Sequence, residues 1–388
     1  MASEQREKER LERKEKKNKK RRIIAWAVIG VIVAVLLVMR IAEIDFSSIG
    51  NTDSNTASVQ SSGYPYSLSS GSDLYFGAVG SEIAVLEDTA YTVLDSSNGN
   101  VIFTADHGYS NPVIVTAGSY SLLYDQGGVS YRLDSDSKNI YQEKASQTVL
   151  CADVSDSGAV AIAQTGTDSL STVSVYGKSL NQKFSYDVNG YVTNVAVDSR
   201  GSRVAFAVVS SENARLKTVV YTMNVDDTEP RAQFEFIGSS VLTLRFSSTD
   251  LFVVGSDFVS VISSLKDINT IFEQGTVNTV SYSFSSNGSL VYAYTAYSGS
   301  ADNIISVVKP SGRVTQVASV SSAVKDITGT SSRVSVLTAD SVITYKISNS
   351  EVLCTYPVDD SYSSIVQVSS DVYARHQASV ERLSDEQE

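Results

Sequence analysis

The side chains that most often supply a nucleophile, a general base or a metal ligand are scarce in this sequence of 388 residues. It contains two histidines, His107 and His376, and two cysteines, Cys151 and Cys354. A structural zinc site takes four Cys, His or carboxylate ligands, and so few residues do not assemble one. No serine lies in a Gly-x-Ser-x-Gly nucleophile turn. We therefore predict that both histidines make structural hydrogen bonds, and we assign no catalytic, cofactor-binding or metal-binding residue.

Two short motifs resemble functional sites but are incomplete. Asp134–Lys138 (DSDSK) resembles the start of a calcium loop but lacks the Gly and the distant Glu of such a loop, so we predict a turn. Asn287–Ser289 has the form of a glycosylation acceptor but lies in a repeated turn described below. The single tryptophan, Trp26, lies near the N-terminus. Its position disfavours quinone-cofactor and sugar sites that use Trp, although Tyr could replace Trp in a lectin.

The charge is divided unevenly along the chain. Residues 1–22 carry 11 basic and 5 acidic side chains, a net charge of +6, whereas residues 41–388 carry 19 basic and 38 acidic side chains, a net charge of −19. Residues 23–39 carry no charge. This arrangement excludes a simple soluble enzyme and is typical of a protein that crosses a membrane once. It also excludes nucleic acid as a partner of the large acidic part, which would repel phosphate.

The uncharged segment predicts a membrane anchor. As a helix, residues 23–39 (IIAWAVIGVIVAVLLVM) extend about 25 Å at 1.5 Å per residue, and continuation to Ala42 with Arg40 snorkelling outward completes a ~30 Å hydrocarbon core. The long basic arm and the lack of an Ala-x-Ala stretch argue against a cleaved signal peptide. We predict a transmembrane helix over residues 23–42 in contact with lipid, with the basic arm, residues 1–22, in the cytoplasm.

The remainder of the chain is predicted to lie outside the cytoplasm, in a cell membrane protein that spans once. Residues 43–62 are rich in Ser, Asn and Thr and predict a flexible tether. Residues 63–388 consist of short alternating apolar segments rich in Val, Ser, Thr and Tyr. This composition predicts an all-β ectodomain.

A recurring pattern divides the ectodomain into repeats. Each repeat has an apolar strand, a polar turn that usually closes on Gly, and a second apolar strand, as in Val197–Val204 and Phe284–Val291. The eight turn markers are Gly80, Gly118, Gly158, Gly201, Asp250, Gly288, Ser332 and Ser370. Their spacing of 38 to 49 residues matches the four-stranded blade of a β-propeller. We attribute the longest step to loop insertions at Ser210–Arg215 and Asp226–Pro230.

The last repeat is incomplete, and this bears on the number of blades. Strands from about Ile365 to Leu383 make only part of a blade, and Gly63–Ser70 could supply the missing outer strand. We therefore favour eight blades, with a seven-bladed ring and a separate terminal hairpin as the alternative. By this count Cys151 lies on the inner strand of the third blade and Cys354 on the outer strand of the seventh. Such positions are too far apart for a disulfide, and we predict free thiols.

The turns at Val197–Gly201 and Phe284–Gly288 resemble the first hairpin of WD40-like and quinoprotein-like propeller blades. A basic N-terminus, one span, a Ser-rich tether and Asp106–Pro112 (DHGYSNP) early in the propeller are similar to an uncharacterised bacterial family of membrane-anchored propellers. The resemblance implies the fold and supplies no catalytic residue. The sequence lacks a Trp-Asp dipeptide, which argues against a true WD40 repeat.

These observations favour a non-catalytic function. We expect a membrane-anchored propeller that acts as a binding or scaffold module for an envelope protein or polymer, with no cofactor. The alternative is a propeller enzyme, a hydrolase or lyase that uses Asp, Glu and Tyr in the central funnel. Glycoside chemistry there would need two carboxylates about 5–10 Å apart in a deep pocket.

Overall fold

The computed structural model describes residues 63–69, 75–297 and 299–383. The chain divides after Val59, and the described residues all belong to the second unit, Gln60–Glu388. The predicted cytoplasmic arm (1–22), transmembrane helix (23–42) and tether (43–62) lie outside the described residues. Within the described part of the chain, no helix is long and apolar enough to cross a membrane.

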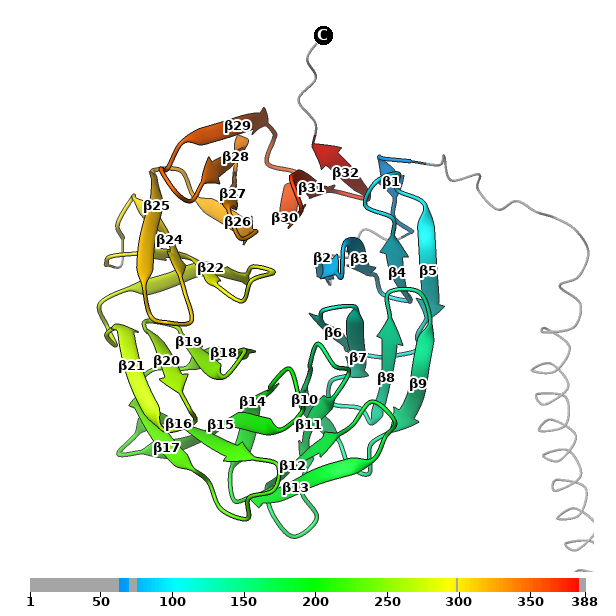
Figure 1. Ribbon diagram of the computed structural model, residues 1–388, viewed down its shortest axis with the longest axis vertical. Coiled ribbons are helices and arrows are strands. Elements are labelled where there is room, and N and C mark those ends of the chain that lie inside the picture. Colours follow the sequence, from blue (N-terminus) through cyan, green and yellow to red (C-terminus); the bar gives the residue numbers. More distant parts are fainter. Residues whose placement is uncertain (1–62, 70–74, 298, 384–388) are drawn as a thin grey trace, which may run out of the picture. The chain divides into compact units, whose positions relative to one another are not determined.

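Eight four-stranded antiparallel sheets follow one another around a ring, and we call them blades 1 to 8 (Figure 1). Blades 1 and 2 contain β2 (Tyr75–Val79), β3 (Glu82–Leu86), β4 (Ala90–Leu94), β5 (Val101–Asp106), β6 (Pro112–Ala117), β7 (Tyr120–Asp125), β8 (Ser130–Ser135) and β9 (Asn139–Lys144). Blades 3 and 4 contain β10 (Val149–Val154), β11 (Val160–Thr165), β12 (Ser171–Tyr176), β13 (Gln182–Val188), β14 (Tyr191–Val197), β15 (Arg203–Glu212), β16 (Arg215–Asn224) and β17 (Ala232–Ile237).

The second half of the ring follows the same order. Blades 5 and 6 contain β18 (Val241–Ser247), β19 (Asp250–Gly255), β20 (Val259–Ser263), β21 (Asp267–Phe272), β22 (Asn278–Phe284), β23 (Leu290–Thr295), β24 (Asn303–Val308) and β25 (Val314–Val320). Blades 7 and 8 contain β26 (Val324–Gly329), β27 (Arg333–Thr338), β28 (Ser341–Lys346), β29 (Val352–Pro357), β30 (Tyr362–Val368), β31 (Asp371–His376), β32 (Ser379–Leu383) and β1 (Tyr66–Ser67). The predicted all-β, eight-bladed propeller is confirmed, and the seven-bladed alternative is wrong.

All eight predicted markers lie at the first hairpin of a blade, between the strand nearest the channel and the next strand outward. Five of these turns place a glycine at positive φ, and in blades 5 and 8 Ser248 and Ser369 adopt φ of 58° and 55°. At Gly201 a side chain is excluded for a second reason, since an added Cβ would lie 2.5 Å from Ala159 Cβ in the preceding blade. Glycine here permits both the turn and the close approach of neighbouring blades.

The expected loop insertion at Ser210–Arg215 is wrong. These residues extend the β15–β16 hairpin, so that both strands reach ten residues and pair up to Glu212 and Arg215. Asn213 and Ala214 form the turn with φ of 50° and 60°, and a two-residue turn with both φ positive matches the twist of the flanking strands. The polar composition that suggested a loop instead reflects exposure on both faces of a projecting hairpin. Asp226–Pro230 is a loop, as predicted.

The hydrophobic core is divided among the junctions between blades. Buried apolar side chains form eight clusters, and each cluster joins two neighbouring blades. At the junction of blades 3 and 4, for example, the fully buried Phe206 packs against Val173 and Val175 and stacks on Tyr221 with ring centroids 5.2 Å apart. A blade buries its two faces only against its neighbours, so the stability of each blade depends on the complete ring.

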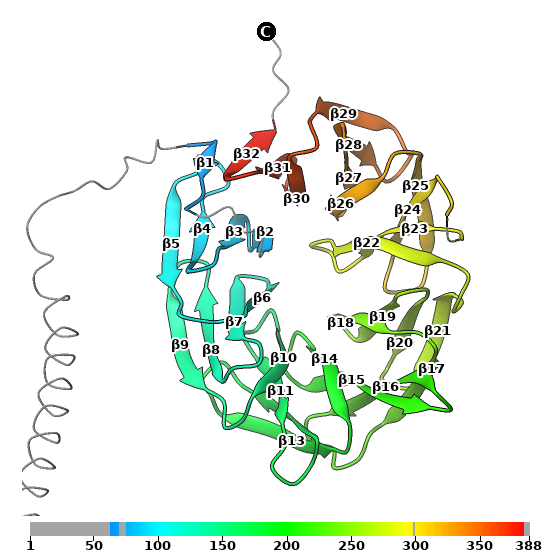
Figure 2. The same cartoon turned by 180° about the vertical axis from the view of Figure 1, so that it is seen from behind.

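The N-terminal segment closes the ring. β1 pairs with β32, with Tyr66 opposite Val380, and thereby completes blade 8 with a strand from the other end of the described chain (Figures 1 and 2). Tyr66 and Leu68 are buried in the cluster between blades 8 and 1. The Tyr64 ring packs 5.3 Å from that of Tyr373. The prediction that Gly63–Ser70 supplies the missing outer strand is confirmed by the pairing of Tyr66 and Ser67.

Both cysteines occupy the predicted strands and are free thiols. Cys151 lies on β10, the inner strand of blade 3, and Cys354 lies on β29, the outer strand of blade 7. Burial raises the pKa of the Cys151 thiol to about 12, with a smaller contribution from the nearby Asp153 carboxylate. The thiol therefore stays protonated and behaves as a small apolar side chain.

Closure by β1 predicts that Tyr66→Ala destabilises the whole propeller. Removal of this ring leaves a cavity between blades 8 and 1 and should lower the free energy of unfolding by about 3 kcal/mol. Thermal unfolding of the full-length chain in detergent, followed by circular dichroism, measures the effect. Tyr297→Ala is the matched control, because Tyr297 is 67% exposed. Equal losses for the two variants, or none for Tyr66→Ala, would contradict the closure.

Candidate functional site

The two histidines have structural partners, as predicted. His107 is buried in the connection from blade 1 to blade 2, where Nε2 donates to the carbonyl oxygen of Glu87 at 3.0 Å. His376 ends β31, and its Nδ1 lies 3.1 Å from Glu381 Oε1 while its ring stacks on Tyr362 with centroids 4.6 Å apart. The two imidazoles lie in different blades and form no common site.

The turn predicted at Asp134–Lys138 is confirmed for Asp136–Lys138, which connect β8 to β9, whereas Asp134 and Ser135 are the last two residues of β8. Asp134 is fully buried and accepts two hydrogen bonds from Arg132, at 2.7 and 2.8 Å, and one from Asn139 Nδ2 at 2.8 Å. Its carboxylate therefore belongs to a buried ion pair. Across the described residues, no group of three or more His, Cys, Asp or Glu side chains is placed to hold a metal ion.

Polar side chains converge on a cavity of about 290 Å³ in the central channel. The first strands of blades 2 to 6 supply most of its wall. Arg245 of β18 reaches across the channel, where Nη1 donates to the carbonyl oxygen of Thr116 on β6 at 3.2 Å. The same nitrogen lies 4.0 Å from Asp153 Oδ1 on β10. Figure 1 shows β18 and β6 on opposite sides of the channel, so Arg245 connects blade 5 with blades 2 and 3.

This contact belongs to a network that joins further blades. Thr116 Oγ1 lies 3.1 Å from the hydroxyl of Tyr75 on β2 in blade 1. Asp153 Oδ2 accepts a hydrogen bond from the backbone N–H of Val197 in blade 4 at 2.9 Å. Blades 1 to 5 are thus linked through one chain of polar contacts around the channel. Such a network fixes the width of the channel at this level.

Burial raises the pKa of Asp153 to about 6, even though Arg245 and the Val197 N–H favour its charged form. The Asp153 side chain is only 9% exposed, so desolvation outweighs the attraction of a guanidinium group that lies 4.0 Å away and is itself partly solvated. A carboxyl group with this pKa can exchange a proton near neutral pH. Among the described residues that line the cavity, however, Asp153 is the one carboxylate, so the paired carboxylates of a glycosidase are not assembled there.

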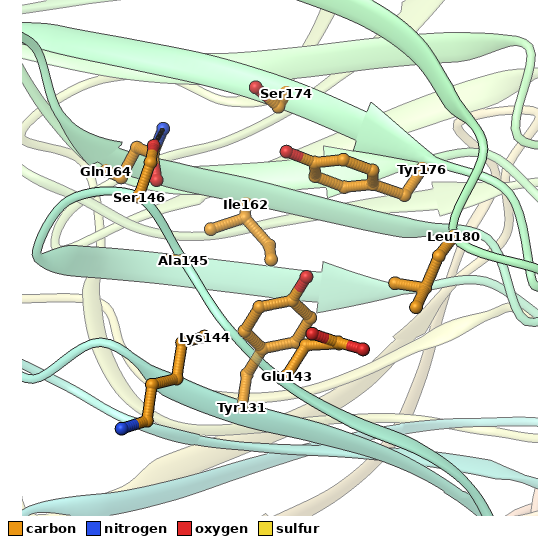
Figure 3. Close-up of a pocket in the computed structure, with 10 residues that line it drawn as sticks. All are labelled: Tyr131, Glu143, Lys144, Ala145, Ser146, Ile162, Gln164, Ser174, Tyr176 and Leu180. Carbon is orange, nitrogen blue, oxygen red and sulfur yellow. Dashed lines mark hydrogen bonds between the residues drawn. The ribbon is translucent and has the colours of Figure 1, made fainter.

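A second cavity, of about 350 Å³, lies between blades 2 and 3. Figure 3 shows that Tyr131 and Tyr176 approach it from β8 and β12, with Ile162 of β11 between them. Gln164 at its other end donates from Nε2 to Ser146 Oγ at 3.0 Å. We call this cavity the inter-blade crevice. It combines ring faces and aliphatic carbons with neutral hydrogen-bonding groups and with two charged residues, Glu143 and Lys144, and small-molecule sites commonly combine apolar surface with a few polar groups.

Comparison with known protein families finds one match, over residues 66–382, to the Family of unknown function (DUF5711). The chain belongs to this family. The matched range begins at the first residue of β1 and ends one residue before the end of β32, so the DUF5711 family corresponds to the complete propeller with its closing strand. Comparison with curated proteins finds no match.

The DUF5711 propeller is similar to several solved structures. Saccharomyces cerevisiae Sqt1 is 10% identical, with a TM-score of 0.51, over 82% of this chain and 96% of that one. BamB from Moraxella catarrhalis is 9% identical, with a TM-score of 0.48, over 81% of this chain and 96% of that one. The β-propeller domain of Swd1 from Myceliophteria thermophila is 8% identical, with a TM-score of 0.42, over 71% and 98%. At 10% identity, the likeness to Sqt1 supports the fold alone.

Sequence reasoning did not single out Asp153 and Arg245 in this DUF5711 chain. Each is a charged residue inside an otherwise apolar first strand, in Val149–Val154 (VLCADV) and Val241–Ser247 (VLTLRFS). A charge at such a position was the available signal, because buried charges are rare unless they are paired. The partner of Arg245 across the channel was not predictable, because it is the backbone carbonyl of Thr116, and every residue has such a group.

The raised pKa of Asp153 predicts a pH-dependent difference between the wild type and Asp153→Asn. Asp153 titrates near pH 6 in the folded protein and near its ordinary value of 3.8 in the unfolded chain, so its contribution to stability is full below 3.8 and is lost as pH rises through about 6. Asn stays neutral at every pH. The stability of Asp153→Asn relative to wild type should therefore rise by about 2 kcal/mol between pH 4 and pH 7.

Thermal unfolding of the full-length chain across this pH range measures the difference. Asp168→Asn removes an exposed carboxylate from the loop before β12 and is the control for a change in net charge. A relative stability of Asp153→Asn that stays constant with pH, or falls as pH rises, would contradict the raised pKa.

Proposed function

We propose that this chain is a membrane-anchored, extracytoplasmic propeller that binds an envelope protein without catalysing a reaction on it. The observation that carries the proposal is a group of exposed apolar side chains on blades 3 to 5, which we call the docking face. Its members are 37% to 59% exposed and are Leu170, Tyr191, Leu216, Ile237 and Leu242. Apolar side chains gathered in this way mark interaction sites on soluble domains.

The five side chains belong to one face of the ring. Leu170 lies between the second and third strands of blade 3, and Leu216 follows the corresponding turn in blade 4. Tyr191 and Leu242 lie at the start of first strands, and Ile237 ends a fourth strand. Because strand direction alternates within each blade, second-to-third turns and the connections to the next blade all lie at the same end of the propeller.

Backbone and side-chain contacts hold these positions side by side. The Gly238 N–H donates to the carbonyl oxygen of Leu216 at 2.7 Å, which places the end of β17 against the start of β16. Asn194 Nδ2 donates to the carbonyl oxygen of Leu242 at 3.1 Å, which joins blade 4 to blade 5. Leu242 is the extra residue of a β-bulge, and such a residue is turned out of the regular ladder. The bulge accounts for the exposure of an apolar side chain on an inner strand.

The projecting β15–β16 hairpin supplies a polar border to this apolar surface. Lys217 Nζ lies 2.9 Å from Glu212 Oε2 and 2.8 Å from Glu235 Oε1. These ion pairs are at least partly exposed and add little stability, but they hold charged side chains beside Ile237, which pairs with Lys217, whereas Leu216 projects from the opposite face of the same sheet. An apolar centre with a polar border is the usual composition of a protein–protein interface.

Placement outside the membrane is supported by the sequence. The cluster of basic residues before the apolar segment favours retention of residues 1–22 in the cytoplasm, with residues 23–42 in lipid. The propeller would then lie outside the membrane, where its negative charge favours solubility and disfavours nucleic acid as a partner.

Asp153 is the one carboxylate among the described residues that line the channel cavity, and this favours a non-catalytic function over a glycosidase. A hydrolase or lyase in the central funnel remains the alternative function, and it would use Asp153 with a tyrosine such as Tyr282, which also lines that cavity. Asp153 is occupied by hydrogen bonding to Val197 and lies near Arg245, an arrangement that links blades. We therefore favour the docking face as the functional surface.

The proposal predicts that the docking face determines which protein is recovered with the full-length chain. After cross-linking in membranes of the source cells, the double variant Tyr191→Ser/Leu242→Ser should recover its partner about tenfold less well than wild type, because large apolar and aromatic side chains contribute most to interfaces. Mass spectrometry of the purified chain measures the recovery.

Val352→Ser/Leu353→Ser is the matched control, since both residues are exposed and lie on the outer strand of blade 7. This variant should recover the same partner as wild type. Recovery that is unchanged in the docking-face variant, or equally reduced in the control, would contradict the proposal.

A further inference from the structure

We propose that the inter-blade crevice binds a neutral saccharide, such as a segment of an envelope polysaccharide. This site is separate from the docking face and goes beyond the proposed function. It rests on that function only in so far as both place the propeller outside the membrane. Three features of the crevice favour such a ligand: its apolar floor, the neutral hydrogen-bonding groups around that floor, and a lining in which the described lysine, Lys144, points away from the centre.

The floor of the crevice is apolar and rigid. Tyr131 and Ile162 are 5% and 2% exposed and belong to the hydrophobic cluster between blades 2 and 3. Tyr131 is fixed by edge-on packing against Tyr141, with ring centroids 6.2 Å apart. A floor of this kind accepts the C–H face of a sugar ring without rearrangement. The half-buried Tyr176, from the next blade, supplies an accessible aromatic ring at the side.

Neutral hydrogen-bonding groups surround this floor. Figure 3 shows the Tyr131 and Tyr176 hydroxyl groups directed toward the space above Ile162. Burial raises the pKa of Tyr131 to about 12, so its hydroxyl group stays protonated and able to donate. Gln164 adds an amide at the opposite end of the crevice. Sugar hydroxyl groups both donate and accept, as these groups do.

The charges at the crevice favour a ligand without an anionic group. Glu143 lies at its edge, whereas the ammonium group of Lys144 points away from its centre in Figure 3. Residues 41–388, which include the propeller, carry a net charge of −19 and would repel an anion at long range. A purely apolar ligand would leave the two tyrosine hydroxyl groups without a hydrogen-bond partner, which costs free energy. A saccharide has apolar C–H faces and neutral hydroxyl groups, and it matches both parts of the lining.

Titration calorimetry of the full-length chain in nanodiscs tests the proposal. The probes are chitotriose and cellotriose, which are neutral, and trigalacturonate, which is anionic. At least one neutral trisaccharide should bind, and trigalacturonate should bind more weakly. Tyr176→Ala should reduce the affinity of the neutral trisaccharide about tenfold through loss of the aromatic contact, and Gln164→Met should reduce it about threefold through loss of the amide.

Tyr297→Ala is the matched control, because Tyr297 is exposed on blade 6, and this variant should bind as wild type does. Gln164→Met keeps a side chain of similar length, so it reports on the site even if Tyr176→Ala fails to fold. Absence of binding by both neutral probes at millimolar concentration would overturn the proposal. Tighter binding of trigalacturonate, or affinity unchanged in the two crevice variants, would also overturn it. None of these results bears on the docking face, which is tested by recovery of a protein.

Discussion

Closure of the ring is the constraint on which the other contacts of the propeller depend. Each blade presents two apolar faces, and the eight junction clusters of the ring form only when every blade has a neighbour on both sides. The last junction is completed by a two-residue strand, β1, and by the side chains of Tyr64, Tyr66 and Leu68 around it. Tyr373 and Arg382 of blade 8 also donate to the carbonyl oxygens of Ser96 and Ser97 in blade 1.

A closed ring determines where binding surfaces can form. The strands are fixed by their neighbours, so variation is confined to turns, bulges and the junctions between blades. The docking face uses a lengthened hairpin and the bulge at Leu242, the channel network uses Arg245 on an inner strand, and the inter-blade crevice uses a junction that side chains leave partly unfilled. The lengthened hairpin and Arg245 are local departures from the repeated unit, whereas a bulge at the position of Leu242 recurs in the first strand of blades 3 to 8. All of these features are held in place by a rigid scaffold.

Features encoded within one repeat could be predicted from the sequence, and features made between distant repeats could not. Turn chemistry located the first hairpin of each blade, because in five of the eight turns a glycine, such as Gly158 or Gly288, adopts positive φ. The extension of β15 and β16 was mistaken for a loop, since exposed strands and loops share polar composition. Arg245 and Thr116 are 129 positions apart, and their contact depends on the curvature of the whole ring. Tyr131 and Tyr176 line one crevice because blade 2 packs next to blade 3, and this packing is a property of the folded ring.

The functional account depends on the propeller being presented outside the membrane, with only the short basic arm in the cytoplasm. Cysteine labelling of the full-length chain in intact spheroplasts, with a membrane-impermeant maleimide and with Cys354 replaced by Ser, tests this most directly. The account predicts that Tyr297→Cys is labelled in intact cells, whereas Ser3→Cys is labelled only after lysis. Labelling of Ser3→Cys in intact cells with Tyr297→Cys protected until lysis would contradict it.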